Sequence, residues 1–577
     1  MKKVRGLILI TFMLIFLCSS VFAIDHVVSN SEDWRDVYST MIYANLLSKA
    51  SNFLVSEKHA PLLLNSISKN SVIQVISSKK VPYIFNYKNI IEARGFPEPE
   101  ELEFDNVNLE LAKMLTDINS FIIIDDSYGY NSISVAPYAI LTKSYVLFVD
   151  NNNINSVMSF LADKNLENII IYGHVDRQVK DALAIYNPKI INLEDRFDNN
   201  IEIVKEYRKI DPANQVVFSN GEFIEQEVMS GKEPVIFIGK QNVPDQIKDY
   251  IKSTDISVGV LVGNDLVGTA TNIRRELGVN TFVKFAQGAR APGGAISSVE
   301  GLDLFYIPTY SLNLEIYSIK YNQATDRLEV TYRNNAEVAT YFKGTITLRS
   351  NTGEEKKIGD IEPIFIDSKS IKTVVYTDIG LVGESFKADV FTLYGESKKS
   401  LEFALQGTLD VEIVNILDDC EISIEDLYYY TTRDYFLVKV KNIGPVDCYV
   451  DIELVDVLIA DEKNTLGLED VAFLPKGDTK GLPIKAELLD YDIERNEYID
   501  VIAYYGQRED SLVKLLKGRF KLILKKFDII YYVAIFIIIL ILLLILLAFL
   551  TRKKCPACDY RNPRYLKNCR MCGSRLD

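Results

Sequence analysis

Four cysteines near the C-terminal end are the residues whose types and spacing most directly predict chemistry. Cys555 and Cys558 form one Cys-x-x-Cys pair, and Cys569 and Cys572 form a second pair after ten intervening residues. Each pair can place two thiolates on one side of a tetrahedral ion, so the two pairs together supply four sulfur ligands. Because four protein ligands leave no open coordination position, we predict one structural zinc ion and no catalytic metal.

The residues around these ligands support the same prediction. Pro556 follows the first ligand and Gly573 follows the last, and in this the segment resembles the zinc-ribbon module found at chain ends in many prokaryotic proteins. Residues 551–577 carry eight basic side chains against two acidic ones. Because free thiols persist in a reducing compartment, we predict a cytoplasmic zinc ribbon that docks a cytoplasmic protein.

Two further cysteines, Cys420 and Cys448, lie alone in a region with β-strand patterning. In an exported region such a pair is expected to form a disulfide. Closing a loop of 28 residues would then stabilise the domain by about 3–4 kcal/mol. The alternative is two free buried thiols.

Two apolar segments predict how the chain is placed in the cell. Residues 1–23 combine three basic side chains, an apolar run and a small residue, Ala23, so they predict a cleaved signal peptide; an uncleaved anchor is the alternative. Residues 529–550 carry no charge and precede Arg552, Lys553 and Lys554, which predicts a transmembrane helix with a cytoplasmic C-terminus. The expected location is therefore the cell membrane, single-pass, with residues 24–528 extracellular.

The stretch before this segment, residues 511–528, is basic and has apolar residues at helical spacing. We predict a juxtamembrane amphipathic helix that lies on membrane lipid, with a plain helical stalk as the alternative.

Charge and motif content narrow the class of function. The net charge is −15, and the acidic residues lie mainly between the two apolar segments, which argues against nucleic acid as the main partner. The three histidines, His26, His59 and His174, have no partner pattern for catalysis, and no nucleophile, zinc-protease or phosphate-loop motif occurs. We therefore predict a protein that is not an enzyme, with a carboxylate-based glycosidase as the alternative.

Residues 31–310 repeat one pattern three times. An apolar strand leads through an Asn- or Gly-rich turn into an amphipathic helix, and a second apolar strand follows, at Tyr83–Phe85, Ile169–Tyr172 and Val258–Val262. Near-continuous apolar strands that alternate with helices are typical of parallel sheets buried on both faces. The repeat predicts three Rossmann-like units in one assembly.

This region resembles the cell wall-binding repeat 2 family of surface-layer and cell-wall proteins. The resemblance lies in short motifs such as WRDVYSTMIYANLL, IIIDDSYGYNSISVAPYAIL and VIFIGKQNVPD, and in the Asp-Arg-Phe signature at residues 195–197. Arg35-Asp36-Val37-Tyr38 is a distorted version of that signature, and the third unit has none. The resemblance implies a compact three-unit module that attaches non-covalently to anionic wall polymers.

From residue 311 the hydrophobic pattern changes to strict alternation in short segments. Two successive sets of such segments match each other, as YRNNAEVATYFKGTITL matches VKNIGPVDCYVDIEL. We predict tandem immunoglobulin-like β-sandwiches, which resemble the adhesion-type spacers of prokaryotic surfaces.

Together these patterns predict a multidomain, membrane-anchored surface protein that binds or organises a cell-envelope polymer or a surface-layer protein. The alternative is a ligand-recognising surface subunit of a transport, secretion or polysaccharide-handling system. The predicted parts are a signal peptide (1–23), three α/β units (24–115, 116–208 and 209–310), two β-sandwiches (311–406 and 407–510), the juxtamembrane helix (511–528), the transmembrane helix (529–550) and the zinc ribbon (551–577).

Overall fold

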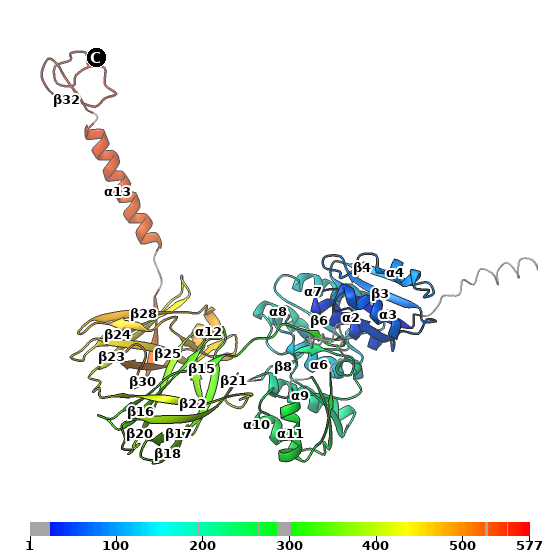
Figure 1. Cartoon of the computed structure of the whole chain (residues 1–577). Coiled ribbons are helices and arrows are strands. Elements are labelled where there is room, and N and C mark those ends of the chain that lie inside the picture. The colour runs from blue at the N-terminus through cyan, green and yellow to red at the C-terminus, as the bar shows by residue number, and fades with distance from the viewer. Residues whose placement is uncertain are drawn as a thin grey trace, which may run out of the picture. The chain divides into compact units, whose positions relative to one another are not determined.

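The computed structural model describes residues 24–193, 195–263, 266–285, 302–525, 529–550 and 552–576. The predicted signal peptide over residues 1–23 lies outside the described residues. The chain divides into two compact units, one ending at Leu417 and one beginning at Asp418. The helices and strands are labelled in Figure 1.

Three α/β units make up the first part of the chain, which confirms the predicted repeat. Each unit contains a four-stranded parallel sheet in which the second strand is the edge and the first strand lies beside the third. The predicted strands over 169–172 and 258–262 are present. The described residues form no strand over 83–85; the third and fourth strands of unit one lie before and after it in the sequence, at Ile73–Ser78 and Glu100–Phe104.

The bounds of the elements are as follows. Unit one contains β1 (His26–Asn30), α2 (Trp34–Leu46), β2 (Ala50–Phe53), η1 (Glu57–His59), α3 (Ala60–Ser66), β3 (Ile73–Ser78), α4 (Tyr87–Ala93), β4 (Glu100–Phe104) and α5 (Val107–Met114). Unit two contains β5 (Ser120–Ile124), α6 (Tyr130–Leu141), β6 (Ser144–Phe148), α7 (Ile154–Ala162), β7 (Asn168–Tyr172), α8 (Arg177–Leu183), η2 (Ala184–Tyr186), β8 (Lys189–Ile191) and α9 (Arg196–Ile210). Unit three contains β9 (Gln215–Ser219), β10 (Phe223–Ile224), η3 (Val228–Ser230), β11 (Val235–Phe237), α10 (Asp245–Lys252), β12 (Val258–Val262), α11 (Val267–Leu277) and β13 (Asn280–Lys284), and β14 (Phe305–Tyr306) pairs with β10.

Two buried asparagines join each unit to the next in the same way. Asn108 in α5 donates to the carbonyl oxygen of Val146 (2.9 Å) and accepts from the N–H of Phe148 (3.2 Å), both on edge strand β6. Asn200 in α9 makes the same two bonds to edge strand β11 in unit three. Each amide thus satisfies the backbone groups that an edge strand would otherwise leave unpaired.

A different residue closes the ring of units. Gln226, between β10 and η3, donates to the carbonyl oxygen of Ser51 on edge strand β2 of unit one (2.7 Å). The elements that follow the first strand of each unit, α2, α6 and η3, contact one another at the centre. One apolar core runs through all three units, so the sequence repeat forms a single module, called here the α/β module.

The first β domain is one curled sheet rather than a sandwich of two separate sheets. The predicted sandwich is wrong because the long strand β22 pairs antiparallel with β21 along most of its length and then parallel with β15. This shared strand joins the two layers, and the predicted boundary at residues 406/407 falls inside it. The strands are β15 (Leu314–Asn322), β16 (Arg327–Asn334), β17 (Thr340–Ser350), β18 (Glu355–Gly359), β19 (Ile364–Ile366), β20 (Ile371–Thr377), β21 (Phe386–Gly395) and β22 (Phe403–Val414).

The second β domain repeats this curled sheet strand for strand. Its shared strand is β30 (Lys514–Lys525), which pairs antiparallel with β29 and parallel with β23. The prediction of a juxtamembrane helix over 511–528 is therefore wrong. The apolar residues of this stretch fit both a helical spacing and the alternation of a strand, and pairing with the neighbouring strands selects the strand. The other elements are β23 (Ile422–Tyr430), β24 (Tyr435–Asn442), β25 (Cys448–Ile459), β26 (Glu462–Gly467), β27 (Ala472–Leu474), β28 (Thr479–Lys485), α12 (Asp490–Arg495) and β29 (Tyr498–Gly506).

The prediction of a transmembrane helix and of a single-pass location in the cell membrane is not upheld. A helix, α13 (Ile529–Leu550), forms over the expected residues. Within the described residues, no helix is both long enough and apolar enough to cross a membrane. The last two strands, β31 (Lys553–Lys554) and β32 (Arg561–Asn562), belong to the cysteine-rich segment.

Candidate metal centre and interdomain ion cluster

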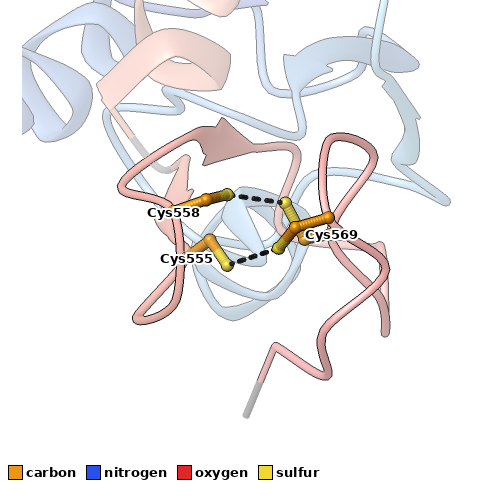
Figure 2. A group of neighbouring side chains, drawn as sticks. Cys555, Cys558 and Cys569 are labelled. Carbon is orange, nitrogen blue, oxygen red and sulfur yellow. Dashed lines mark hydrogen bonds between the residues drawn. The ribbon is translucent and has the colours of Figure 1, made fainter.

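The four C-terminal cysteines lie together, and their sulfur atoms are within 4.8 Å of one another. Sγ of Cys555 is 3.6 Å from Sγ of Cys572, and Sγ of Cys558 is 3.6 Å from Sγ of Cys569 (Figure 2). Four sulfurs bound to one zinc ion at about 2.3 Å would be about 3.8 Å apart. The donor set and its spacing therefore fit one tetrahedral ion, and zinc as its identity stays a prediction.

The two Cys-x-x-Cys pairs have the same local structure. The N–H of Asp559 donates to the carbonyl oxygen of Cys555 (2.9 Å), and the N–H of Gly573 donates to that of Cys569 (3.0 Å). Both residues have a positive φ, 59° for Asp559 and 72° for Gly573. This left-handed turn is inexpensive for glycine and tolerated by aspartate, and it directs both thiols of each pair to one side.

Hydrogen bonds around the sulfurs shift the pKa values of these thiols in different directions. Burial raises the pKa of the Cys569 thiol, but N–H groups of Cys572 and Met571 and the amide of Asn562 outweigh it and lower that pKa to about 6. The Tyr560 N–H lowers the pKa of Cys558, but hydrogen bonds to the neighbouring sulfurs outweigh it and raise this pKa to about 12. Four crowded thiolates repel one another, so a bound cation would favour their ionisation.

Replacing Cys569 and Cys572 together by serine is expected to remove bound zinc and unfold the segment 552–576, because two ligands cannot hold the ion. Metal content by mass spectrometry and protease sensitivity of this segment are the measurements. Ser574→Ala is the matched control, since Ser574 contacts Sγ of Cys572 (3.3 Å) without being a ligand. Unchanged zinc content in the double variant would contradict the assignment.

The Cys420–Cys448 disulfide is present in the second β domain, with an S–S distance of 2.03 Å. Both cysteines are fully buried, and the bond links the start of the domain to strand β25. The alternative of two free thiols is therefore excluded for this structure.

The Asp195-Arg196-Phe197 signature lies at a contact between the α/β module and the first β domain. Asp195 is the N-cap of α9, accepting from the N–H groups of Phe197 and Asp198 at 2.9 and 2.8 Å. Arg196, the first residue of α9, reaches the segment 396–402 that connects β21 to β22. The signature thus joins two domains of this chain.

Arg196 is the centre of a buried ion cluster, called here the Arg196 cluster (Arg196, Glu396, Glu402 and Asp195). The guanidinium binds both carboxylate oxygens of Glu402 at 2.7 Å and one of Glu396 at 3.2 Å. It also lies over the ring of Tyr130, 4.2 Å from its centre, and donates to the hydroxyl of Tyr310. The side chains of Arg196 and Glu402 are 9% and 3% exposed, so this pairing takes place almost without water.

Hydroxyl and amide groups complete the cluster. Ser397 and Ser400 donate their hydroxyls to Oδ2 of Asp195, and Gln246 in α10 donates to both oxygens of the same carboxylate. The N–H of Asn242 donates to the carbonyl oxygen of Glu402 (3.0 Å). The connection between β21 and β22 is therefore held by units two and three of the α/β module together.

The Arg196 cluster holds more carboxyl groups than cations, and the pKa values of its two glutamates are raised. Burial, opposed by Arg196 and reinforced by Asp195 and Glu402, raises the pKa of Glu396 to about 8. Burial also raises the pKa of Glu402 above its usual value. Near neutral pH, Glu396 is therefore largely protonated.

The pKa of Glu396 predicts a pH dependence of stability. Because its pKa is higher folded than unfolded, its contribution is fully present below about pH 4.5 and declines as the pH rises to about 8. Glu396→Gln, which mimics the protonated acid, is expected to flatten the thermal-stability profile over this window and to exceed the parent chain at pH 8. Glu337→Gln, at a side chain that is 85% exposed, is the control. Parallel profiles for the parent and E396Q would contradict the assignment.

The two carboxylates that follow strand β5, Asp125 and Asp126, have structural partners. Oδ1 of Asp125 accepts from the N–H of Ser127 (2.7 Å), as a turn cap does. Asp126 pairs with Arg35 of unit one at 2.5 Å, and Arg35 also pairs with Asp33. The distorted signature at 35–38 therefore joins unit one to unit two. For the Arg196 cluster, no signal in the sequence marks Glu396 and Glu402 as partners of Arg196.

Comparison with known proteins gives only distant likenesses. No family model matches the chain, and no curated protein matches it. Among solved structures, Cwp6 from Clostridium difficile is 11% identical with a TM-score of 0.34, over 45% of this chain and 54% of Cwp6. The chain thus spans about half the length of Cwp6.

Two other solved structures resemble parts of the chain. The periplasmic chaperone SfaE is 12% identical with a TM-score of 0.13, over 37% of this chain and 100% of SfaE. A chain from a chaperone–tip adhesin complex of CFA/I fimbriae is 14% identical with a TM-score of 0.14, over 36% of this chain and 98% of that chain. These scores carry no functional argument, and the resemblance to cell wall-binding repeat 2 stays a prediction.

Proposed function

We propose that the chain is a non-enzymatic surface protein that binds or organises a cell-wall or surface-layer component through its α/β module. The Arg196 cluster carries this proposal. Its buried charges are paired with one another across two domains, which suits a rigid support for the module. A group that exchanges protons with a substrate would need access to it.

The disulfide supports a surface location. Disulfides persist in oxidising environments and are rare in the cytosol. Cys420 and Cys448 are fully buried and joined, so the second β domain is built for such an environment.

The zinc ribbon has a docking role in this proposal. Its four cysteines form a closed ligand set, which is suited to fixing a shape rather than to catalysis. Tyr560, Tyr565 and Met571 are exposed around it, at 44%, 77% and 73%, as in surfaces that meet a protein partner. If partner binding survives the Cys569→Ser, Cys572→Ser variant, the ribbon is only a folded terminal segment.

Sedimentation with purified cell envelope tests the main proposal. The full chain should sediment with isolated walls or with purified surface-layer protein, and heat-denatured chain should not. Absence of sedimentation would overturn the proposal. If a thermal-shift screen also showed stabilisation by a small solute, the chain would instead be a ligand-recognising subunit of a transport or secretion system.

A further inference from the structure

The second β domain carries a groove on its outer face that the proposed function does not use. It has a volume of about 640 Å³ and lies over strands β24 and β28 and the turns at their ends. The residues that line it include Tyr435, Leu437, Gly481, Pro483, Arg433 and Lys485. No residue of the α/β module contributes to it.

Strand alternation explains why the groove has an apolar floor. Phe436 and Val438 of β24 lie in the core, so Tyr435 and Leu437 face outward. In the strand register Leu437 lies opposite Pro483, and Tyr435 lies opposite Lys485. Gly481 has no side chain, and the end of the Leu437 side chain lies within 3.0 Å of where a Cβ would be. The Leu437 side chain therefore packs over Gly481, and Pro483 lies opposite Leu437 in the floor.

An aromatic ring with a fixed orientation forms one wall. The ring of Tyr435 stacks on that of Tyr430, with centroids 4.8 Å apart and an angle of 12° between the planes. Stacking holds a broad apolar face in place before any ligand arrives, which reduces the entropy lost on binding.

The rim selects for a neutral ligand. Arg433 and Lys485 carry positive charge, Asp434 and Glu487 carry negative charge, and Lys485 also pairs with Glu469 at 2.6 Å, so the rim carries charges of both signs. A groove that recognised a polyanion or a polycation would show one sign of charge. Charged groups of both signs can instead donate to and accept from hydroxyl groups.

We propose that this groove binds a neutral oligosaccharide, with one pyranose ring packed on Tyr435 and its hydroxyls on the rim. A sugar ring has an apolar face and polar edges, which match the floor and the rim. The inference goes beyond the proposed function, because it adds a saccharide-binding surface in the second β domain to the wall contact proposed for the α/β module.

Calorimetric titration of the full chain with the β-1,4-linked N-acetylglucosamine tetramer tests the proposal. Tyr435→Ala should weaken binding by about tenfold or more, a loss of about 1.4 kcal/mol, whereas Tyr435→Phe keeps the ring and should bind like the parent. Gly481→Val should also weaken binding, since its side chain would displace Leu437 from the floor. Both weakening variants are outside the core, so circular dichroism should remain unchanged.

Several outcomes would overturn the proposal. These are no heat of binding with the tetramer, equal binding by the alanine and phenylalanine variants, or binding of a proline-rich peptide in place of the sugar. Wall sedimentation of the alanine variant separates this proposal from the proposed function. If the alanine variant still sediments but does not bind the tetramer, the groove binds sugar and another surface also holds the wall. If the parent chain sediments without binding the tetramer, only the groove proposal fails.

Discussion

Replacing Arg196 by methionine is expected to lower the free energy of unfolding of the α/β module by about 3–5 kcal/mol, because the buried Glu402 carboxylate loses its counter-charge. Glu402 is 3% exposed and cannot regain water without movement of the β21–β22 connection. The chain has one tryptophan, Trp34, which is buried in α2 against Phe148, so its fluorescence follows this module in urea.

Two comparisons show whether the loss is electrostatic. Arg349→Met removes an arginine whose side chain is 51% exposed in the first β domain, and it should cost less than about 1 kcal/mol. Adding Glu396→Gln and Glu402→Gln to the Arg196 variant removes the uncompensated charges and should recover much of the loss. If Arg196→Met costs no more than Arg349→Met, the cluster does not hold the two domains together.

Removing the Cys420–Cys448 disulfide should cost about 3.5 kcal/mol in the second β domain, since the bond closes a loop of 28 residues. Replacing both cysteines by alanine should lower the urea midpoint of the β-sheet signal and leave the Trp34 transition in place, because the two lie in different units.

Reduction of the parent chain provides the control for this prediction, because it breaks the bond without changing packing. Reductant should destabilise the parent chain and have no further effect on the double alanine variant. A variant as stable as the parent would mean that the closed loop contributes little to this domain.

The sequence predicted the α/β module better than the β domains, for a physical reason. Strand and helix periods are local, so the repeat of units was visible in one chain. Whether two layers form a sandwich or one curled sheet depends on strands β22 and β30, each twelve residues long, which change partners part-way. For β30, Leu516 and Phe520 fit a helix as well as a strand, and only the pairing with β29 decides.

The two candidate sites differ in the same way. The metal centre was predictable because all four ligands lie within one short segment. The Arg196 cluster was not, since Arg196 and Glu402 are brought together only by the docking of two domains. The signature at 195–197 marked the arginine but contained nothing about its partners.

The closed ring of three units has a consequence for how the module evolves and can be engineered. Each unit supplies the amide that covers an edge of its neighbour, through Asn108, Asn200 and Gln226. Excising one unit would leave one edge strand uncovered and one amide without its edge, which invites intermolecular strand pairing. The three units are therefore expected to be kept together, because gaining or losing a single unit would disrupt the contacts that link them.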